Sequence, residues 1–123
     1  MENDRSKFKK DFIKRLIKFS ISILRFAEKH KKESILWSIF NQLIRSATSI
    51  GANVVEARAS SSKRDYLKFF EIALKSANET LYWLLLLKEV CVDSMVEIEV
   101  MFIEANEIAK ILASSVLTLK NKS

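Results

Sequence analysis

At 123 residues the chain has the length of one domain, and it contains one glycine and no proline. Strands and tight turns use both residues heavily, so this composition excludes all-β and α/β folds and predicts long helices joined by short polar loops. The longest uncharged apolar run, Leu81–Leu87, is too short to cross a membrane, which takes about 18 residues. Because lysines and arginines interrupt the N-terminal apolar positions, we expect no signal peptide and a cytosolic protein.

The basic charge is concentrated at the N-terminus. Residues 1–32 contain 11 Lys and Arg against 4 Asp and Glu, a net charge of +7, whereas residues 33–123 carry −1. The entire excess of +6 therefore comes from the first quarter of the chain. This asymmetry favours a polyanionic partner, either nucleic acid or an anionic membrane surface.

Four apolar-periodic segments are separated by short polar breaks. Short connections force neighbouring long helices to run antiparallel, so the sequence predicts a single up-down-up-down four-helix bundle domain. The predicted helices cover residues 6–30, 34–58, 62–89 and 94–120.

Serines mark three of the predicted helix starts. Ser34 is a candidate N-cap of the second helix. Ser62 with Asp65 forms an acidic variant of the capping box, and Ser94 with Glu97 has the standard capping-box spacing.

The first helix is predicted to divide into a broad apolar side and a basic side. Its core stripe is Phe8, Phe12, Leu16, Phe19, Ile23 and Phe26, widened by Ile13, Ile17, Leu24 and Ala27. On the remaining side, six cations fall within about 60° of one another on a helical projection. This basic ridge consists of Lys7, Lys14, Lys18, Arg25, Lys29 and Lys32. It contains no aromatic residue, so we expect phosphate contacts that tolerate any sequence.

The second helix has an apolar face and an ordered polar one. Its predicted core is Leu36, Phe40, Leu43, Ile44, Ala47, Ile50 and Val54. Gly51 lies on that side, where the missing Cβ permits a close helix approach. The other face carries the polar ridge, Arg45, Ser49, Asn53 and Glu56, with spacings of 4, 4 and 3. It is interpreted either as a hydrogen-bond network between helices or subunits, or as a ligand-binding groove.

The third helix is predicted to be apolar on two sides. Its core stripe is Tyr66, Phe70, Ala73, Ala77, Leu81 and Leu84. A second apolar line, Ile72, Trp83 and Leu86, projects from the opposite side and predicts an oligomer interface. On the fourth helix, Glu97, Glu104 and Glu107 are interpreted as a solvated face.

Motifs for catalysis, cofactor binding or metal binding are missing. A di-iron carboxylate site needs Glu-x-x-His pairs on two helices, and the sequence has one histidine, His30. A single glycine cannot build a phosphate-binding loop, and the single cysteine, Cys91, fits a small buried side chain near a helix end. We therefore expect no enzymatic activity and no cofactor.

A family resemblance rests on the segments 45–57, 62–65, 73–75 and 79–84. Over roughly Leu36 to Lys88, they resemble a bacterial four-helix-bundle family. It includes proteins encoded in intervening sequences of large-subunit rRNA genes and the accessory variability determinant of diversity-generating retroelements. Intervening-sequence members often have proline after the isoleucine and end the motif in Glu-Gly; Gly51 and Ala57 here indicate a different branch.

The resemblance implies a ring-shaped homo-oligomer, a homopentamer, that binds nucleic acid and, in the accessory-determinant branch, a reverse transcriptase. It supplies no catalytic residues. The leading hypothesis is thus a non-catalytic, oligomeric RNA- or DNA-binding accessory protein, associated with a retroelement or an rRNA intervening sequence. The alternative is an oligomeric protein–protein scaffold whose lysines serve solubility. A membrane role is disfavoured because the bundle consumes the apolar face beside the basic ridge.

Overall fold

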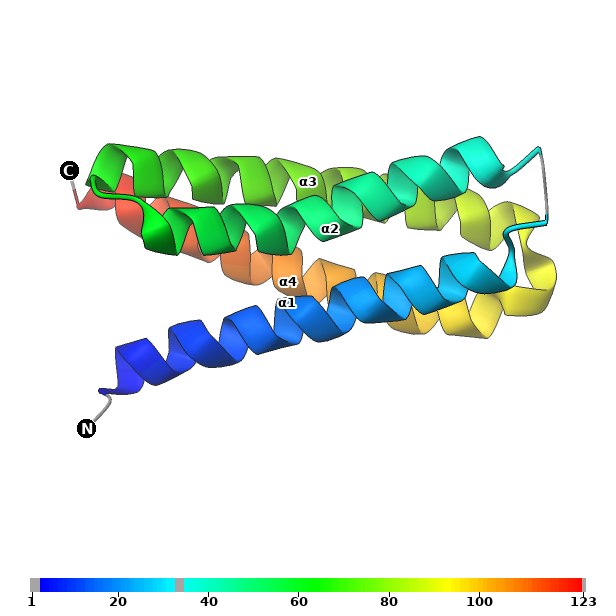
Figure 1. Cartoon of the computed structure of the whole chain (residues 1–123), viewed down its shortest axis with the longest axis horizontal. Coiled ribbons are helices and arrows are strands. Elements are labelled where there is room, and N and C mark those ends of the chain that lie inside the picture. The colour runs from blue at the N-terminus through cyan, green and yellow to red at the C-terminus, as the bar shows by residue number, and fades with distance from the viewer. Residues whose placement is uncertain (1–2, 33–34, 123) are drawn as a thin grey trace.

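The computed structural model describes residues 3–32 and 35–122. In these ranges four α-helices and one short 3-10 turn occur, and no strand. Successive helices run in opposite directions, as predicted for the four-helix bundle (Figure 1). They are α1 (Asp4–Lys29), α2 (Trp37–Ala59), α3 (Lys63–Val90) and α4 (Met95–Asn121), with the 3-10 turn η1 (Val92–Ser94) before α4.

Local capping explains two of the helix starts. The Asn3 side chain accepts a hydrogen bond from the Ser6 backbone N–H at 2.7 Å, and the Ser62 hydroxyl accepts one from the Asp65 N–H at 3.1 Å, as predicted. Ser94 is the N-cap residue of α4, as predicted, and η1 leads directly into α4, but the Ser94 side chain makes no capping hydrogen bond. Its hydroxyl instead lies 3.3 Å from His30 Nε2.

The second helix begins later than predicted. It starts at Trp37, with Leu36 as an N-cap that offers no side-chain acceptor. The predicted cap, Ser34, lies outside the described residues.

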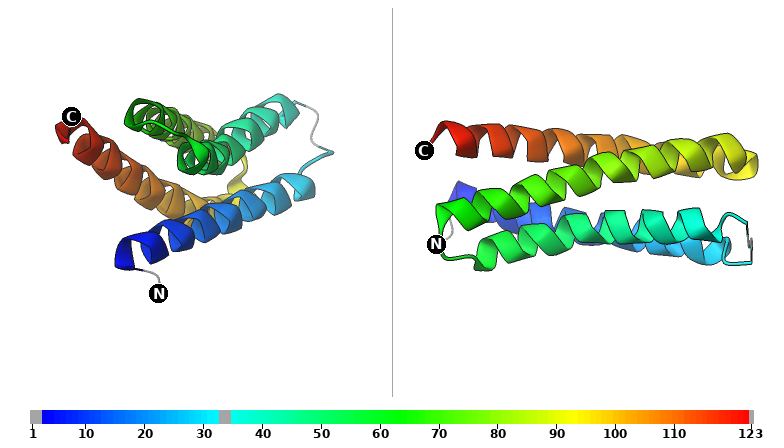
Figure 2. Two further views of the ribbon diagram at one scale, coloured as in Figure 1. Left: turned by 60° about the vertical axis from the view of Figure 1, so that its left-hand side comes forward. Right: turned by 90° about the horizontal axis from the view of Figure 1, so that it is seen from above.

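Helix packing is tight at one side of the bundle and loose at another. The α2–α3 pair is packed most extensively and the α1–α4 pair least. Figure 2 shows α1 and α4 diverging toward the ends that carry the two chain termini. One continuous apolar core joins all four helices; its largest fully buried apolar side chains are Phe26, Phe40, Leu16, Ile23, Leu43, Ile50, Leu84, Leu87, Ile98, Ile108 and Leu112.

Three apolar side chains that were predicted to join the α1 core are exposed instead. Phe8 is 57% exposed, Ile17 53% and Leu24 45%. The apolar side of α1 spans about half of its circumference. The neighbouring helices α2 and α4 cover only part of that side, because α4 is loosely packed against α1. The apolar surface beside the basic ridge is therefore not consumed by the bundle, contrary to the prediction.

The glycine of α2 faces α1. A Cβ added to Gly51 would lie 3.5 Å from the Leu16 Cβ, which is an ordinary van der Waals contact. The helices are in contact at this point, but their approach does not require a glycine.

Candidate nucleic-acid interface

All six cations of the basic ridge lie on the exposed surface of α1 and its C-terminal extension. In the part of the chain that the structure describes, Lys14, Lys18 and Arg25 have no ion-pair partner. Lys29 differs, because its ammonium lies 2.8 Å from a Glu97 carboxylate oxygen on α4. The ridge thus combines free cations with one that is neutralised at the edge of α4.

The C-terminal half of the ridge borders a groove between α1 and α4. Lys18, Arg25 and Lys29 line it together with Ile21, Ser22 and Glu97, around a volume of about 510 Å³. Since five of these residues lie on α1 and one on α4, the ridge follows the loosely packed side of the bundle.

An ion pair joins α1 to α4 at the middle of the same side. The Arg15 guanidinium donates through Nε and Nη2 to the two carboxylate oxygens of Glu104, both at 2.7 Å. This hydrogen bonding raises the pKa of Arg15, against the opposing effect of desolvation, and the charges of Glu104 and Glu107 raise it further. Of the predicted solvated face, Glu107 is exposed, and Glu97 and Glu104 remain partly exposed while each pairs with a cation of α1.

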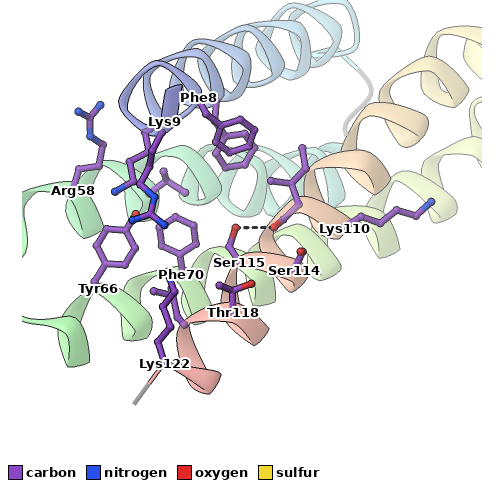
Figure 3. A pocket seen from close by; sticks show the side chains of 15 residues that line it. Phe8, Lys9, Arg58, Tyr66, Phe70, Lys110, Ser114, Ser115, Thr118 and Lys122 are labelled. Atoms are coloured by element: carbon purple, nitrogen blue, oxygen red, sulfur yellow. Dashed lines mark hydrogen bonds between the residues drawn. The ribbon is translucent and has the colours of Figure 1, made fainter. Parts of the chain in front are cut away.

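A larger cleft lies beyond this ion pair, where α1 and α4 diverge (Figure 3). It has a volume of about 560 Å³ and an apolar floor that includes Phe8, Phe12, Tyr66 and Phe70. Hydroxyl groups line the α4 wall, and none of the lining residues is acidic. The cations that line the cleft are Arg5, Lys9, Arg58, Lys110 and Lys122.

The aromatic side chains of the cleft are ordered in two stacked pairs. The rings of Phe8 and Phe12 lie 6.2 Å apart with an interplanar angle of 10°, and those of Tyr66 and Phe70 lie 4.9 Å apart at 19°. The Lys9 ammonium lies 5.3 Å from the centre of the Tyr66 ring, within the range of a cation–π interaction. This site was missed because Phe8 was predicted to join the core, whereas it is 57% exposed; Phe12 and Phe70, each 6% exposed, do belong to the core.

The polar ridge of α2 splits into a buried and an exposed part. Asn53 Nδ2 donates to the Ser49 carbonyl oxygen at 2.8 Å, and the Ser76 hydroxyl on α3 donates to Ser49 Oγ at 3.0 Å. Arg45 reaches a Glu79 carboxylate oxygen on α3 at 3.5 Å. Glu56 is exposed and lies outside this network. The geometry favours hydrogen bonding between α2 and α3 over a ligand groove at Ser49 and Asn53.

The predicted interface line on α3 is less exposed than the pattern indicated. Ile72 and Leu86 are each 36% exposed, while Trp83 is partly buried against the core, and its indole N–H donates to Glu79 at 3.0 Å. Trp83 therefore does not project from the side opposite the core.

A more exposed apolar stripe was missed on α4. It consists of Val96, Val100 and Ile103, whose exposed fractions are 81%, 64% and 56%. Their spacing of 4 and 3 residues places them on one face of the helix, a signal that was present in the sequence.

His30 and Cys91, which were not expected to be catalytic, both lie at the C-terminal ends of helices. The His30 ring lies 4.8 Å from that of Phe26 and 5.1 Å from that of Phe40, at the C-terminal end of α1. Cys91 is partly buried at the C-cap of α3.

No group of three His, Cys, Asp or Glu side chains that could hold a metal occurs in residues 3–32 and 35–122. Over those ranges, none of the helices is long and apolar enough to span a membrane.

Comparisons with known proteins give a family and a fold. Residues 9–114 match the family model described as 23S rRNA-intervening sequence protein. A solved structure from Bacteroides thetaiotaomicron VPI-5482, of a protein with unknown function from the S23 ribosomal protein family, is 32% identical to this chain, with a TM-score of 0.81. The match covers 88% of this chain and 96% of that one. No curated protein matched this chain.

Proposed function

Because the chain belongs to the 23S rRNA-intervening sequence protein family, we propose that it is a non-catalytic accessory protein that binds nucleic acid through the basic ridge. The family name associates its members with ribosomal RNA, so RNA is the first ligand to test and DNA the second. Ribosomal RNA as ligand would place the protein in the cytoplasm.

The observation that carries this proposal is the row of exposed, unpaired cations on α1. Lys14, Lys18 and Arg25 have no acidic partner among the described residues, so each is available to a phosphate group without first breaking an ion pair. The ridge extends along the whole of α1, which is 26 residues or about 39 Å long at 1.5 Å per residue. That length is enough to follow several consecutive phosphates.

Self-association is part of the proposal. Exposed apolar side chains on α4 and α3 supply surface for subunit contacts, and the family resemblance suggests a ring-shaped homopentamer. A ring would repeat the basic ridge, and simultaneous contacts along one strand would raise the overall affinity by avidity. A reverse transcriptase is a further candidate partner, by resemblance to the retroelement accessory determinant.

A second candidate function is a protein–protein scaffold without a nucleic-acid ligand. The exposed stripe Val96, Val100 and Ile103 favours it, together with Ile17, Ile21 and Leu24 on α1, all of which are more than 40% exposed. A monomeric protein rarely leaves several such groups uncovered on neighbouring turns.

Charge reversal on the ridge separates these candidates. In a mobility-shift assay at moderate salt, wild-type protein should retard RNA, and the triple variant Lys14→Glu, Lys18→Glu, Arg25→Glu should not. The three side chains are exposed, so circular dichroism should show an unchanged fold. If the triple variant binds RNA and DNA as well as wild type, the ridge is not the contact; if wild type shifts neither even at low salt, the scaffold function replaces the proposal.

A further inference from the structure

The cleft between the diverging ends of α1 and α4 combines two kinds of chemistry. Phe12 and Phe70 at its floor are each only 6% exposed, whereas the ring of Phe8 at its α1 side is 57% exposed (Figure 3). Its five lining cations have no carboxylate among the lining residues to neutralise them. The hydroxyls of Ser114 and Thr118 on α4 add hydrogen-bonding groups. An occupant that complements the cleft therefore needs a flat apolar part and a negative charge.

We propose that this cleft binds an unpaired nucleotide of a single-stranded nucleic acid, with the base stacked on Phe8 and the flanking phosphates contacted by Arg5 and Lys9. Aromatic faces beside cations are the combination by which proteins hold unstacked bases, because every base has a π-face and every linkage a phosphate. The cleft volume of about 560 Å³ lies within the range of ligand sites.

The position of the cleft connects it to the basic ridge. The ridge borders the α1–α4 side from Lys18 to Lys29, the Arg15–Glu104 ion pair crosses the middle, and the cleft opens beyond it toward the N-terminus of α1. None of the ridge cations lines the cleft, so a strand bound from Lys18 to Lys29 would have to pass the Arg15–Glu104 ion pair to enter it. The inference rests on the proposed function and deepens it: the ridge binds any nucleic acid, and the cleft adds a preference for single strands.

Substitutions at Phe8 test the stacking directly. The probes are a labelled oligoadenylate and a blunt-ended RNA duplex of equal phosphate number, titrated by fluorescence anisotropy. Phe8→Ala should weaken oligoadenylate binding about tenfold, the typical loss of one base–aromatic stack, and leave duplex binding unchanged. Phe8→Trp should retain the affinity, and Phe8→Leu, which keeps an apolar side chain without a π-face, should lose it.

Ile17→Ala is the matched control, because Ile17 is similarly exposed on the same helix and does not line the cleft. It should leave both affinities unchanged. Thr118→Glu places a carboxylate on the exposed α4 wall and should selectively weaken oligoadenylate binding by charge repulsion.

The outcomes keep the two proposals apart. The cleft assignment is overturned if Phe8→Ala binds both probes like wild type, if it weakens both equally, or if Phe8→Leu binds like wild type, which would show that no stacking on an aromatic ring takes place. Each of these results leaves the ridge intact as a binding surface. If wild type binds neither probe at low salt, the proposed function fails first and the cleft assignment with it.

Discussion

Ser46 and Thr80 are the two polar residues that are buried within the described core, and they meet across the α2–α3 contact. The Thr80 hydroxyl lies within hydrogen-bond distance of Ser46 Oγ, at 2.9 Å, and of the Ser76 carbonyl oxygen, at 2.8 Å. The Ser46 hydroxyl can donate to the Leu43 carbonyl oxygen at 3.2 Å. Each hydroxyl thus has a partner within its own helix as well as across the contact.

Because each hydroxyl has two hydrogen-bond partners, replacing either one should lower the free energy of unfolding only modestly, and the two losses should not be additive. Thr80→Val and Ser46→Ala should each lower the free energy of unfolding by about 1 kcal/mol, the usual net contribution of a hydrogen bond. The double variant should lose less than the sum, because the pair shares one bond. Urea denaturation measures all three, with exposed Thr118→Val as the control near zero. Fully additive losses would show that the two hydroxyls do not interact.

Single residues also show where prediction from the sequence stopped. The Ser62–Asp65 cap was predictable, because its partners lie three residues apart and need no tertiary information. The alignment of Ser49 with Asn53 followed likewise from helical spacing. Their contact with Ser76 did not, since it depends on how α3 is rotated against α2.

At the scale of elements, α1 illustrates a limit of hydrophobic periodicity. The pattern correctly located its buried stripe, including Phe12, Leu16 and Ile23, but it could not tell how much of the apolar side neighbouring helices would cover. Since α1 and α4 diverge, Phe8 lies exposed at a cleft, while Phe12 and Phe70 beside it remain buried in the core. The basic ridge was predictable as a helical face, while its relation to the cleft required the packing.

The Arg15–Glu104 ion pair is the strongest polar contact between α1 and α4, and it is bidentate. Both side chains remain about one-third exposed, so solvent screens the interaction. Arg15→Ala should therefore lower the free energy of unfolding by about 0.5–1 kcal/mol, measured by thermal and urea denaturation. Arg25→Ala removes an unpaired arginine from the same helix and should change stability little. Equal effects of the two variants would mean that the ion pair contributes nothing.

At the scale of the whole molecule, the exposed apolar stripe on α4 predicts subunit contacts. Val100→Glu should lower the particle mass measured by light scattering from a multiple of 14.2 kDa toward that value, because an unpaired charge buried at an interface costs several kcal/mol. Trp83→Glu is a poorer probe, since Trp83 is partly buried in its own subunit.

Val92→Glu is the matched control, because Val92 and Val100 are both 64% exposed and Val92 lies in the α3–α4 connection. It should leave the mass unchanged. Leu86→Glu places the same charge on the α3 surface that was predicted as the interface, so its particle mass can be compared with that of Val100→Glu. A wild-type protein that is monomeric at micromolar concentration, or a Val100→Glu variant with wild-type mass, would exclude the α4 stripe as an interface.

The central claim is that α1 contacts phosphates, and the salt dependence of RNA affinity tests it most directly. Wild-type affinity should fall with salt by about 0.9 logarithmic units per phosphate contact per decade on a duplex, and about 0.7 on a single strand. Lys14→Ala with Lys18→Ala should reduce that slope by roughly one unit for each lost contact. The charge-matched variant Lys68→Ala with Lys75→Ala, on the exposed face of α3, should keep the wild-type slope. Identical slopes for both variants would contradict the account.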